Sequence, residues 1–169
     1  MIAGVERRRL VPHADERGTL RELWRGSNQP LTLRQALVTS SKKGALRGMH
    51  YHLRQADLCY VASGVVFMAL VDLRGDLAKQ EFHLDENESV LIPAGVAHGY
   101  LAESDATMCY LLTQEVDGSD EFGFRFDDPA AGITWPTLAP ILSARDRGAG
   151  DVAAARAHVR SALSLGARA

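Results

Sequence analysis

The chain has 169 residues, of which 46% are hydrophobic and 24% are charged, and its formal net charge is −2 at pH 7. This length fits one folded domain with its own core, and the near-neutral charge gives no electrostatic reason to expect a nucleic acid or an anionic membrane as a partner. Residues 1–13 lack the apolar centre of a signal peptide, and no apolar run approaches a membrane span. We therefore expect a cytoplasmic protein in which Cys59 and Cys109 stay reduced.

Short strands separated by turns are predicted along most of the chain. Residues 1–12 carry three consecutive arginines and are expected to form a solvated edge. Alternating or β-branched residues then predict strands at residues 19–24, 31–40, 45–53, 79–84, 89–92, 100–102 and 107–116. The apolar run 58–73 predicts two more strands, with a tight turn at Ser63-Gly64.

The last third of the chain has a different pattern. Residues 117–140 are irregular, and such a segment usually packs over the mouth of a barrel. Residues 151–165 form the only convincing helix, which Asp151 can cap and Gly166 can end. Many short strands with Gly and Pro turns predict an all-β fold, a jelly-roll or barrel. We expect a single domain over residues 1–169, with its core at about residues 10–150 and a short C-terminal helix.

Histidines and one acid give the sequence its clearest chemical signal. His50 and His52 lie two residues apart, so on a strand both side chains face the same side. Asp57 follows five residues later, and His98 comes after a Pro-Ala-Gly turn. Three imidazoles and one carboxylate are a suitable ligand set for one divalent metal ion, either iron, nickel, manganese or zinc. The alternative is that the histidines are polar residues lining a cavity.

Two resemblances extend this pattern. The spacing of Gly44, His50, His52, Asp57 and Gly64 resembles the first cupin motif, with Asp where cupins usually carry Glu. The segment from Pro93 to His98 resembles the core of the second motif. The glycine expected before that proline is Asn87, and the asparagine expected after the histidine is Ala102. The second match is therefore partial.

A longer resemblance covers about residues 10–150. The chain is similar to the dTDP-4-dehydrorhamnose 3,5-epimerase family, which has the cupin jelly-roll fold. Seven stretches carry the resemblance in the same order: Asp15–Gly18 with Glu22, Leu46–Tyr51, Val71–Arg74, Ile92–Gly99, Phe126–Pro129, Ile133–Pro136 and Leu142–Asp146. The resemblance implies a homodimer of barrels that acts, without a metal, on a nucleotide-linked 4-keto-6-deoxy sugar.

The resemblance also implies roles for individual residues. His50 matches the catalytic base, which removes a proton from the carbon next to the ketone, and Asp146 matches the acid that orients this base. His98 matches a histidine that lines the substrate pocket. Four residues match positions that hold the sugar nucleotide: Arg17, Glu22, Gln35 and Arg47. Arginine suits a diphosphate because its planar fork donates two hydrogen bonds, although a surface salt bridge is the alternative for both arginines.

Several positions depart from the family pattern, and three of them bear on the chemistry. Val116 stands where the family has its general-acid tyrosine, and Asp57 stands where it has a lysine near the developing oxyanion. His52 occupies a position that is often Gln or Ala. A divalent metal held by His50, His52, Asp57 and His98 would restore the positive charge that an enolate needs. A ligated His50 nitrogen cannot take a proton, so the metal and base roles exclude each other there.

The sequence thus predicts an isomerase that epimerises or isomerises a dTDP-linked 4-keto-6-deoxy sugar, with or without help from a metal. Val116 disfavours a double epimerisation, because valine cannot deliver a proton. One alternative is a metal-dependent cupin oxygenase, cyclase or lyase that acts on a small molecule without a nucleotide. Two others are a ligand-binding cupin without turnover and a family member that has lost its activity.

Overall fold

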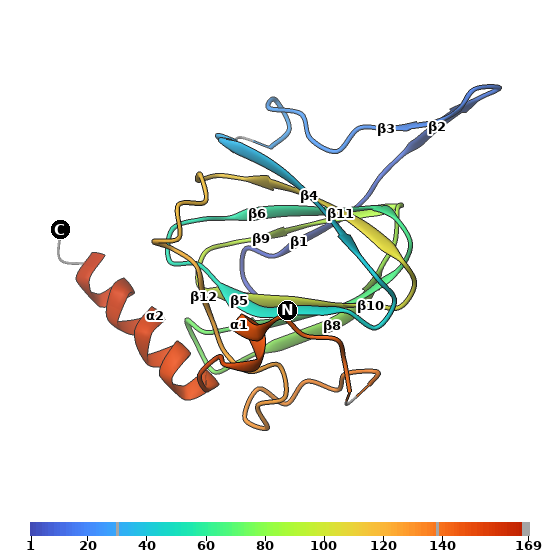
Figure 1. The fold of residues 1–169 in the computed structure, drawn as a ribbon. Coiled ribbons are helices and arrows are strands. Elements are labelled where there is room, and N and C mark those ends of the chain that lie inside the picture. The colour runs from blue at the N-terminus through green and yellow to red at the C-terminus, as the bar shows by residue number, and fades with distance from the viewer. Residues whose placement is uncertain (30, 138, 167–169) are drawn as a thin grey trace.

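The computed structural model describes residues 1–29, 31–137 and 139–166. Two five-stranded antiparallel sheets lie face to face in this part of the chain (Figure 1). The first sheet consists, in spatial order, of β1 (Glu6–Arg9), β9 (Glu88–Ile92), β6 (Asp57–Ser63), β11 (Ala106–Leu112) and β4 (Gln35–Ser41). The second consists of β12 (Phe122–Gly123), β5 (Leu46–Tyr51), β10 (Val96–Ala102), β7 (Val66–Asp72) and β8 (Lys79–Leu84). The predicted all-β jelly-roll fold of the cupin type is confirmed.

The apolar run 58–73 forms β6 and β7, as predicted. Gly64 joins them with a φ of +84°, and a Cβ atom added there would lie 2.4 Å from the Asp105 carbonyl oxygen. Six of the seven residues of β7 are buried, because the strand is covered on both faces. Met68 packs between the two sheets, whereas Phe67 packs against segments outside the second sheet.

The segment after β11 covers a different surface from the one expected. Phe124, Phe126 and Trp135 belong to the same buried cluster as Phe67 and Val71 of β7. The segment after β12, up to Trp135, therefore packs on the outer face of the second sheet, and Figure 1 shows it below the sheet. From the irregular segment, Glu121 lines the cavity between the two sheets, together with Val116 just before the segment.

Other predictions needed correction. Residues 6–9 are exposed as expected, but they form an edge strand that pairs with β9. The strand expected at residues 19–24 is β3 (Gly18–Arg21), which pairs only with β2 (Pro12–Asp15). The helix expected at residues 151–165 is α2 (Val152–Gly166), and a second, short helix precedes it, α1 (Ala144–Arg147). No described helix has the length and apolar character needed to cross a membrane.

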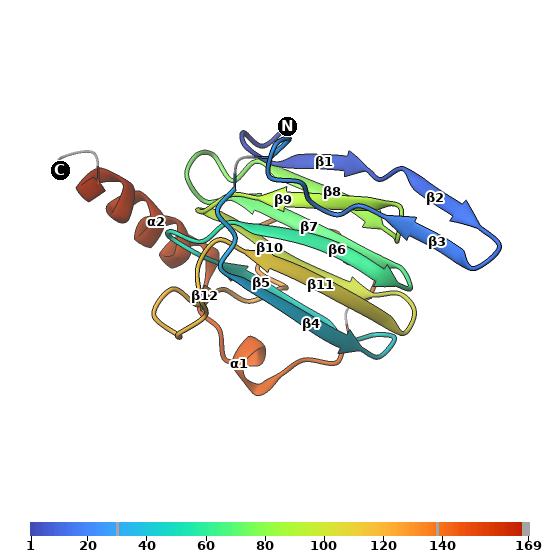
Figure 2. The same cartoon turned by 90° about the horizontal axis from the view of Figure 1, so that it is seen from above.

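Two elements project from the barrel (Figure 2). The β2–β3 hairpin extends beyond the end of the first sheet, and it leaves Leu20 64% exposed. Helix α2 docks through Val152, Ala155 and Val159, which are buried in the cluster outside the second sheet. Its C-terminal half points away from the barrel.

Close backbone contact between β5 and β10 sets the floor of the cavity between the sheets. Gly48 has a φ of +141°, and a Cβ atom there would lie 2.5 Å from the Cα atom of Gly99 on the neighbouring strand. The antiparallel register places His50 opposite His98. Paired residues of adjacent strands present their side chains on the same face, so the two histidines share one side of this sheet.

Candidate active site

A cavity of about 220 Å³ lies between the two sheets and is lined by residues of β4, β5, β6, β7, β10 and β11. Its wall includes five of the residues that the sequence singled out, namely Arg47, His50, His52, Asp57 and His98. A larger hollow, of about 870 Å³, lies under the projecting part of α2. Its lining is mainly apolar and includes none of these residues, so we take the smaller cavity as the candidate active site.

His50 forms an acid–base pair with Asp146. The Nε2 atom of His50 lies 2.8 Å from Oδ1 of Asp146, and their side chains are 25% and 6% exposed. Helix α1 positions the carboxylate: Ser143 caps this helix and its Oγ accepts a hydrogen bond of 3.0 Å from the Asp146 backbone N–H. Because a carboxylate only accepts, a neutral His50 carries its proton on Nε2 and keeps a lone pair on Nδ1. This is the arrangement of an oriented general base.

The charge of Asp146 is maintained by its neighbours. Burial by itself would raise the pKa of the Asp146 carboxyl, but the hydrogen bond and charge of His50 outweigh it. The pKa therefore lies below its ordinary value, and Asp146 is ionised at neutral pH. An ionised Asp146 holds the imidazole in one orientation and favours its protonated form once it has accepted a proton.

His52, Asp57 and His98 form a second, more deeply buried group, which we call the histidine–aspartate cluster. The Nε2 atoms of His52 and His98 lie 3.5 Å and 3.3 Å from the same oxygen, Oδ2 of Asp57. The three ligand atoms all lie within 4.8 Å of one another. His50 is not part of this group, because β5 ends at Tyr51 and the His50 ring is directed to Asp146. The four-residue metal set expected from the sequence is thus reduced to three.

Contacts within the cluster shift the pKa values of Asp57 and His52 in opposite directions. Burial would raise the pKa of Asp57, but contacts with His52 and His98 keep it well below the usual range. Burial would likewise lower the pKa of His52, but the Asp57 carboxylate and the Asp120 carbonyl raise it to about 9. A buried anion in this position therefore attracts positive charge.

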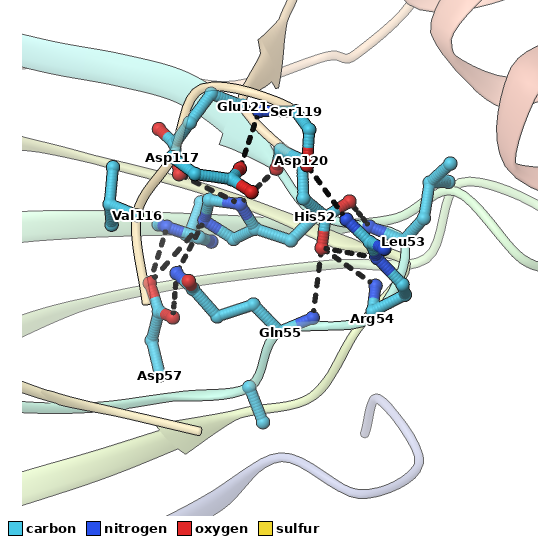
Figure 3. Close-up of polar contacts among 12 residues, drawn as sticks. His52, Leu53, Arg54, Gln55, Asp57, Val116, Asp117, Ser119, Asp120 and Glu121 are labelled. Carbon is cyan, nitrogen blue, oxygen red and sulfur yellow. Dashed lines mark hydrogen bonds and ion pairs between the residues drawn. The ribbon is translucent and has the colours of Figure 1, made fainter. Parts of the chain in front are cut away.

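A single acid fixes the loop that carries His52 (Figure 3). The Asp120 carboxylate accepts hydrogen bonds of 2.7 to 3.1 Å from the backbone N–H groups of Leu53, Arg54 and Gln55. The Asp120 carbonyl oxygen lies 2.6 Å from Nδ1 of His52. Gln55 in turn donates a hydrogen bond of 2.7 Å to Oδ1 of Asp57. The loop thus ties His52 and Asp57 into one network.

The residues expected to hold a nucleotide are spread over the molecule. Arg47 lines the cavity and donates to Ser41 and to the Ser40 carbonyl. The Oε1 atom of Gln35 accepts the backbone N–H of Val116 at 2.8 Å. Gln35 therefore holds the loop beside the cavity.

Two of the predicted substrate residues lie outside the cavity. Arg17 is on the projecting hairpin, with its side chain 85% exposed and paired with Asp15. Glu22 follows β3 and pairs with Arg25. Within one chain, neither residue belongs to the lining of the cavity.

Among the other residues that line the cavity, Glu121, Arg145 and Tyr110 were not placed in the site by sequence reasoning. Glu121 lies 3.3 Å from Nδ1 of His52 and 3.6 Å from Nη1 of Arg145. Tyr110 reaches the same cavity from β11. Glu121 stands in an irregular segment and Arg145 in the four-residue helix α1, and no periodic pattern marks either of them. The sequence offers Tyr110, like Tyr51, as a substitute for the missing general acid, but it does not place the hydroxyl.

A jelly-roll with an oriented histidine base in an internal cavity defines a small-molecule enzyme of the acid–base type. Comparison with known proteins identifies it more closely. The family described as dTDP-4-dehydrorhamnose 3,5-epimerase matches residues 1–153. The chain belongs to this family.

Individual relatives agree with this assignment. The spore coat polysaccharide biosynthesis protein SpsL of Bacillus subtilis is 36% identical over 148 residues, which cover 81% of this chain and 98% of the relative. A dTDP-4-dehydrorhamnose 3-epimerase of Streptomyces niveus is 37% identical over 138 residues, covering 76% and 67%. The crystal structure of ChmJ, a 3'-monoepimerase of Streptomyces bikiniensis in complex with dTDP-quinovose, superposes with a TM-score of 0.85 at 29% identity, covering 96% of this chain and 92% of that one.

Proposed function

We propose that this enzyme epimerises a dTDP-linked 4-keto-6-deoxy sugar at a carbon next to the ketone, with His50 as the base. The observation that carries the proposal is the contact of 2.8 Å between His50 and Asp146 at the wall of the cavity. Its support from relatives is that two of them are a 3-epimerase and a monoepimerase with a dTDP sugar bound.

The reaction follows from the chemistry of the pair. His50 takes the proton from the carbon next to the ketone, and the electrons of the broken C–H bond form an enolate. Asp146 stays ionised and stabilises the imidazolium that results. Return of a proton to the opposite face of the same carbon gives the epimer. The overall change is therefore redox-neutral and needs no co-substrate.

We assign the return of the proton to Tyr110. This phenol lines the cavity from β11, and burial raises the pKa of its hydroxyl, so it keeps its proton at neutral pH. The other cavity tyrosine, Tyr100, lies beside Tyr110 and shares hydrogen bonds with Ser41 and Thr39. Val116, at the position of the family's acid, is 41% exposed and carries only hydrocarbon. We therefore propose inversion at one carbon instead of two.

Solvent exchange tests this function directly. The enzyme is incubated with dTDP-4-keto-6-deoxyglucose in D₂O, and deuterium at C3 and C5 is followed by NMR. We expect incorporation at one of the two carbons, and a fall of about 10²- to 10⁴-fold in its rate in His50→Asn. His83→Asn, on the surface opposite Glu103, serves as the matched control and should exchange at the wild-type rate. Absence of deuterium at both carbons would exclude the reaction.

We further propose that the enzyme is a homodimer. A two-stranded hairpin is marginally stable in water unless something covers it, and β2–β3 pairs with no other strand. The chain entering the hairpin and the hairpin itself also leave Val11 and Leu20 67% and 64% exposed. A second copy on this surface would cover the hairpin and bring Arg17 and Glu22 to the partner's cavity. The free thiols Cys59 and Cys109 fit a reducing compartment, so we place the dimer in the cytoplasm.

A mixing experiment tests whether the hairpin serves the partner. The His50→Asn protein alone is expected to be inactive because it lacks the base. The Arg17→Ala protein alone is expected to be weakly active because it lacks a substrate-binding side chain. Unfolded together and refolded as mixed dimers, they restore about one quarter of wild-type activity if Arg17 acts across the interface, since half of the dimers then contain one complete site. If Arg17 acts within its own chain, the mixture is no more active than the sum of its components.

A further inference from the structure

The histidine–aspartate cluster has no role in the proton transfer between His50 and the sugar. We propose that His52, Asp57 and His98 bind one Zn²⁺ ion in a four-coordinate site whose fourth position opens into the cavity. This inference goes beyond the proposed function, because the site is defined by its ligand geometry and does not depend on which molecule enters the cavity.

The tautomers of both histidines favour a metal. Nδ1 of His52 faces the Asp120 carbonyl at 2.6 Å, and Nδ1 of His98 faces the Val96 carbonyl at 3.3 Å. A carbonyl oxygen can only accept, so each Nδ1 carries a proton and each Nε2 of a neutral ring presents its lone pair to Asp57. Histidine ligands of metals usually donate their other N–H to a carbonyl or carboxylate in this way.

Distances within the cluster fit tetrahedral coordination. Bonds of about 2.0–2.1 Å at tetrahedral angles place neighbouring ligand atoms about 3.3–3.4 Å apart, whereas octahedral neighbours would lie about 3.0 Å apart. The observed separations between Asp57 Oδ2 and the two Nε2 atoms are 3.3 and 3.5 Å. These separations are longer than an ordinary N–H···O hydrogen bond of about 2.7–3.2 Å. The two separations therefore fit a tetrahedral ion placed between Asp57 and the histidines.

The remaining partners complete such a site. Gln55 donates to Oδ1 of Asp57 at 2.7 Å, which occupies that oxygen and leaves Oδ2 for the ion. The residues His52, Asp57 and His98 are 5%, 3% and 9% exposed, so water competes weakly for the ion. All three line the cavity that also holds His50, and two imidazoles with one carboxylate are a donor set that zinc accepts. With Zn²⁺ bound, the cluster would have one net positive charge beside the cavity.

The test measures metal binding by the full chain, expressed without a histidine tag. Protein stripped with a chelator is titrated with Zn²⁺ and with Co²⁺, whose visible ligand-field bands report coordination number, and bound metal is counted by elemental analysis. We expect one ion per chain and the absorption of four-coordinate cobalt. Asp57→Asn and His98→Gln should each weaken binding by more than about 100-fold, and Gln55→Leu by about 10- to 100-fold, as for other outer-shell partners.

Two controls keep this test independent of the epimerase reaction. His50→Asn should keep full metal affinity while losing deuterium exchange, and His83→Asn should keep both. Wild-type protein that binds metal no better than Asp57→Asn would overturn the site and show that protons alone neutralise the cluster. Loss of metal in His50→Asn would also overturn the three-ligand geometry. Near-UV circular dichroism of each variant shows whether it is folded, and the wild-type titration decides the outcome even if one variant is not.

Discussion

His50 and His52 are separated by one residue, and the structure gives them opposite surroundings. His50 is 25% exposed and contacts one carboxylate, from a helix 96 positions along the chain. His52 is 6% exposed, and its two ring nitrogens face a backbone carbonyl and the buried Asp57. The difference teaches that an imidazole is suited to moving protons when one nitrogen is oriented and the other is accessible. When carbonyl contacts fix the tautomer and the lone pair faces an acid, it is suited to holding a cation.

The largest effect is expected from a change that alters the contact of His50 and leaves the surroundings of His52 intact. Asp146→Asn keeps the shape of the side chain but can donate a proton to Nε2, which favours the wrong tautomer of His50. We expect kcat to fall by about 10²- to 10⁴-fold with little change in KM. Metal affinity should not change. Steady-state kinetics with the sugar nucleotide measures this split, and an equal loss in KM would point to a damaged pocket instead of a misoriented base.

The second prediction concerns the close contact between the backbones of β5 and β10, which supports the surroundings of both His50 and His52. A Cβ atom at Gly48 would lie 2.5 Å from Gly99 and 3.1 Å from the His98 carbonyl. We expect Gly48→Ala to lower the free energy of unfolding by about 3 kcal/mol, as overpacking in a close strand contact does. Gly44→Ala is the matched control: its φ is also positive, +84°, but nothing lies within 4 Å. It should cost only about 1–2 kcal/mol. Urea unfolding of both variants measures the difference, and equal losses would contradict the close contact.

A third change affects the His52 side alone. Asp120→Ala removes the acceptor of three backbone N–H groups in the loop after β5. We expect a loss of about 1–3 kcal/mol in stability and weaker metal binding, whereas the contact between His50 and Asp146 is retained. Asp117→Ala, which removes one exposed hydrogen bond to Ser119 in the same segment, should cost less than about 0.5 kcal/mol. If the two variants behaved alike, the loop would not depend on Asp120.

The smallest effect concerns the cap of α1. Ser143→Ala removes the hydroxyl that accepts the Asp146 backbone N–H. We expect a cost of about 0.5–2 kcal/mol in stability and only a slight decrease in kcat, because the contact between His50 and Asp146 holds the carboxylate from its other end. Ser164→Ala, near the exposed end of α2, is the control. A decrease in kcat as large as that of Asp146→Asn would show that the cap, and not the histidine, positions the acid.

The sequence predicted the fold because its signals are local. Gly and Pro mark most strand ends, and the apolar run of β6 and β7 is long enough to need burial on both faces. The contact between His50 and Asp146 could be predicted only from the family resemblance, because no pattern within the chain links two residues 96 positions apart.

The site was predicted less completely, for two physical reasons. Spacing placed His50 and His52 on one face, but that alternation holds only within a strand, and β5 ends at Tyr51. Spacing also cannot tell whether Arg17 reaches the cavity of its own chain or that of another. In the structure, Arg17 lies on the projecting hairpin, outside the cavity lining of its own chain.

The register between β5 and β10 has a consequence for how new specificities could arise. Because His50 of β5 pairs with His98 of β10, both imidazoles are held by hydrogen-bonded strands inside the second sheet. The residues that stand on loops beside them, such as Val116 and Glu121, are free to vary without moving the base. An engineer who wished to change the sugar accepted by this barrel would therefore vary positions such as Val116 in the loop after β11, keep Asp120 as the anchor of the His52 loop, and leave both strands untouched.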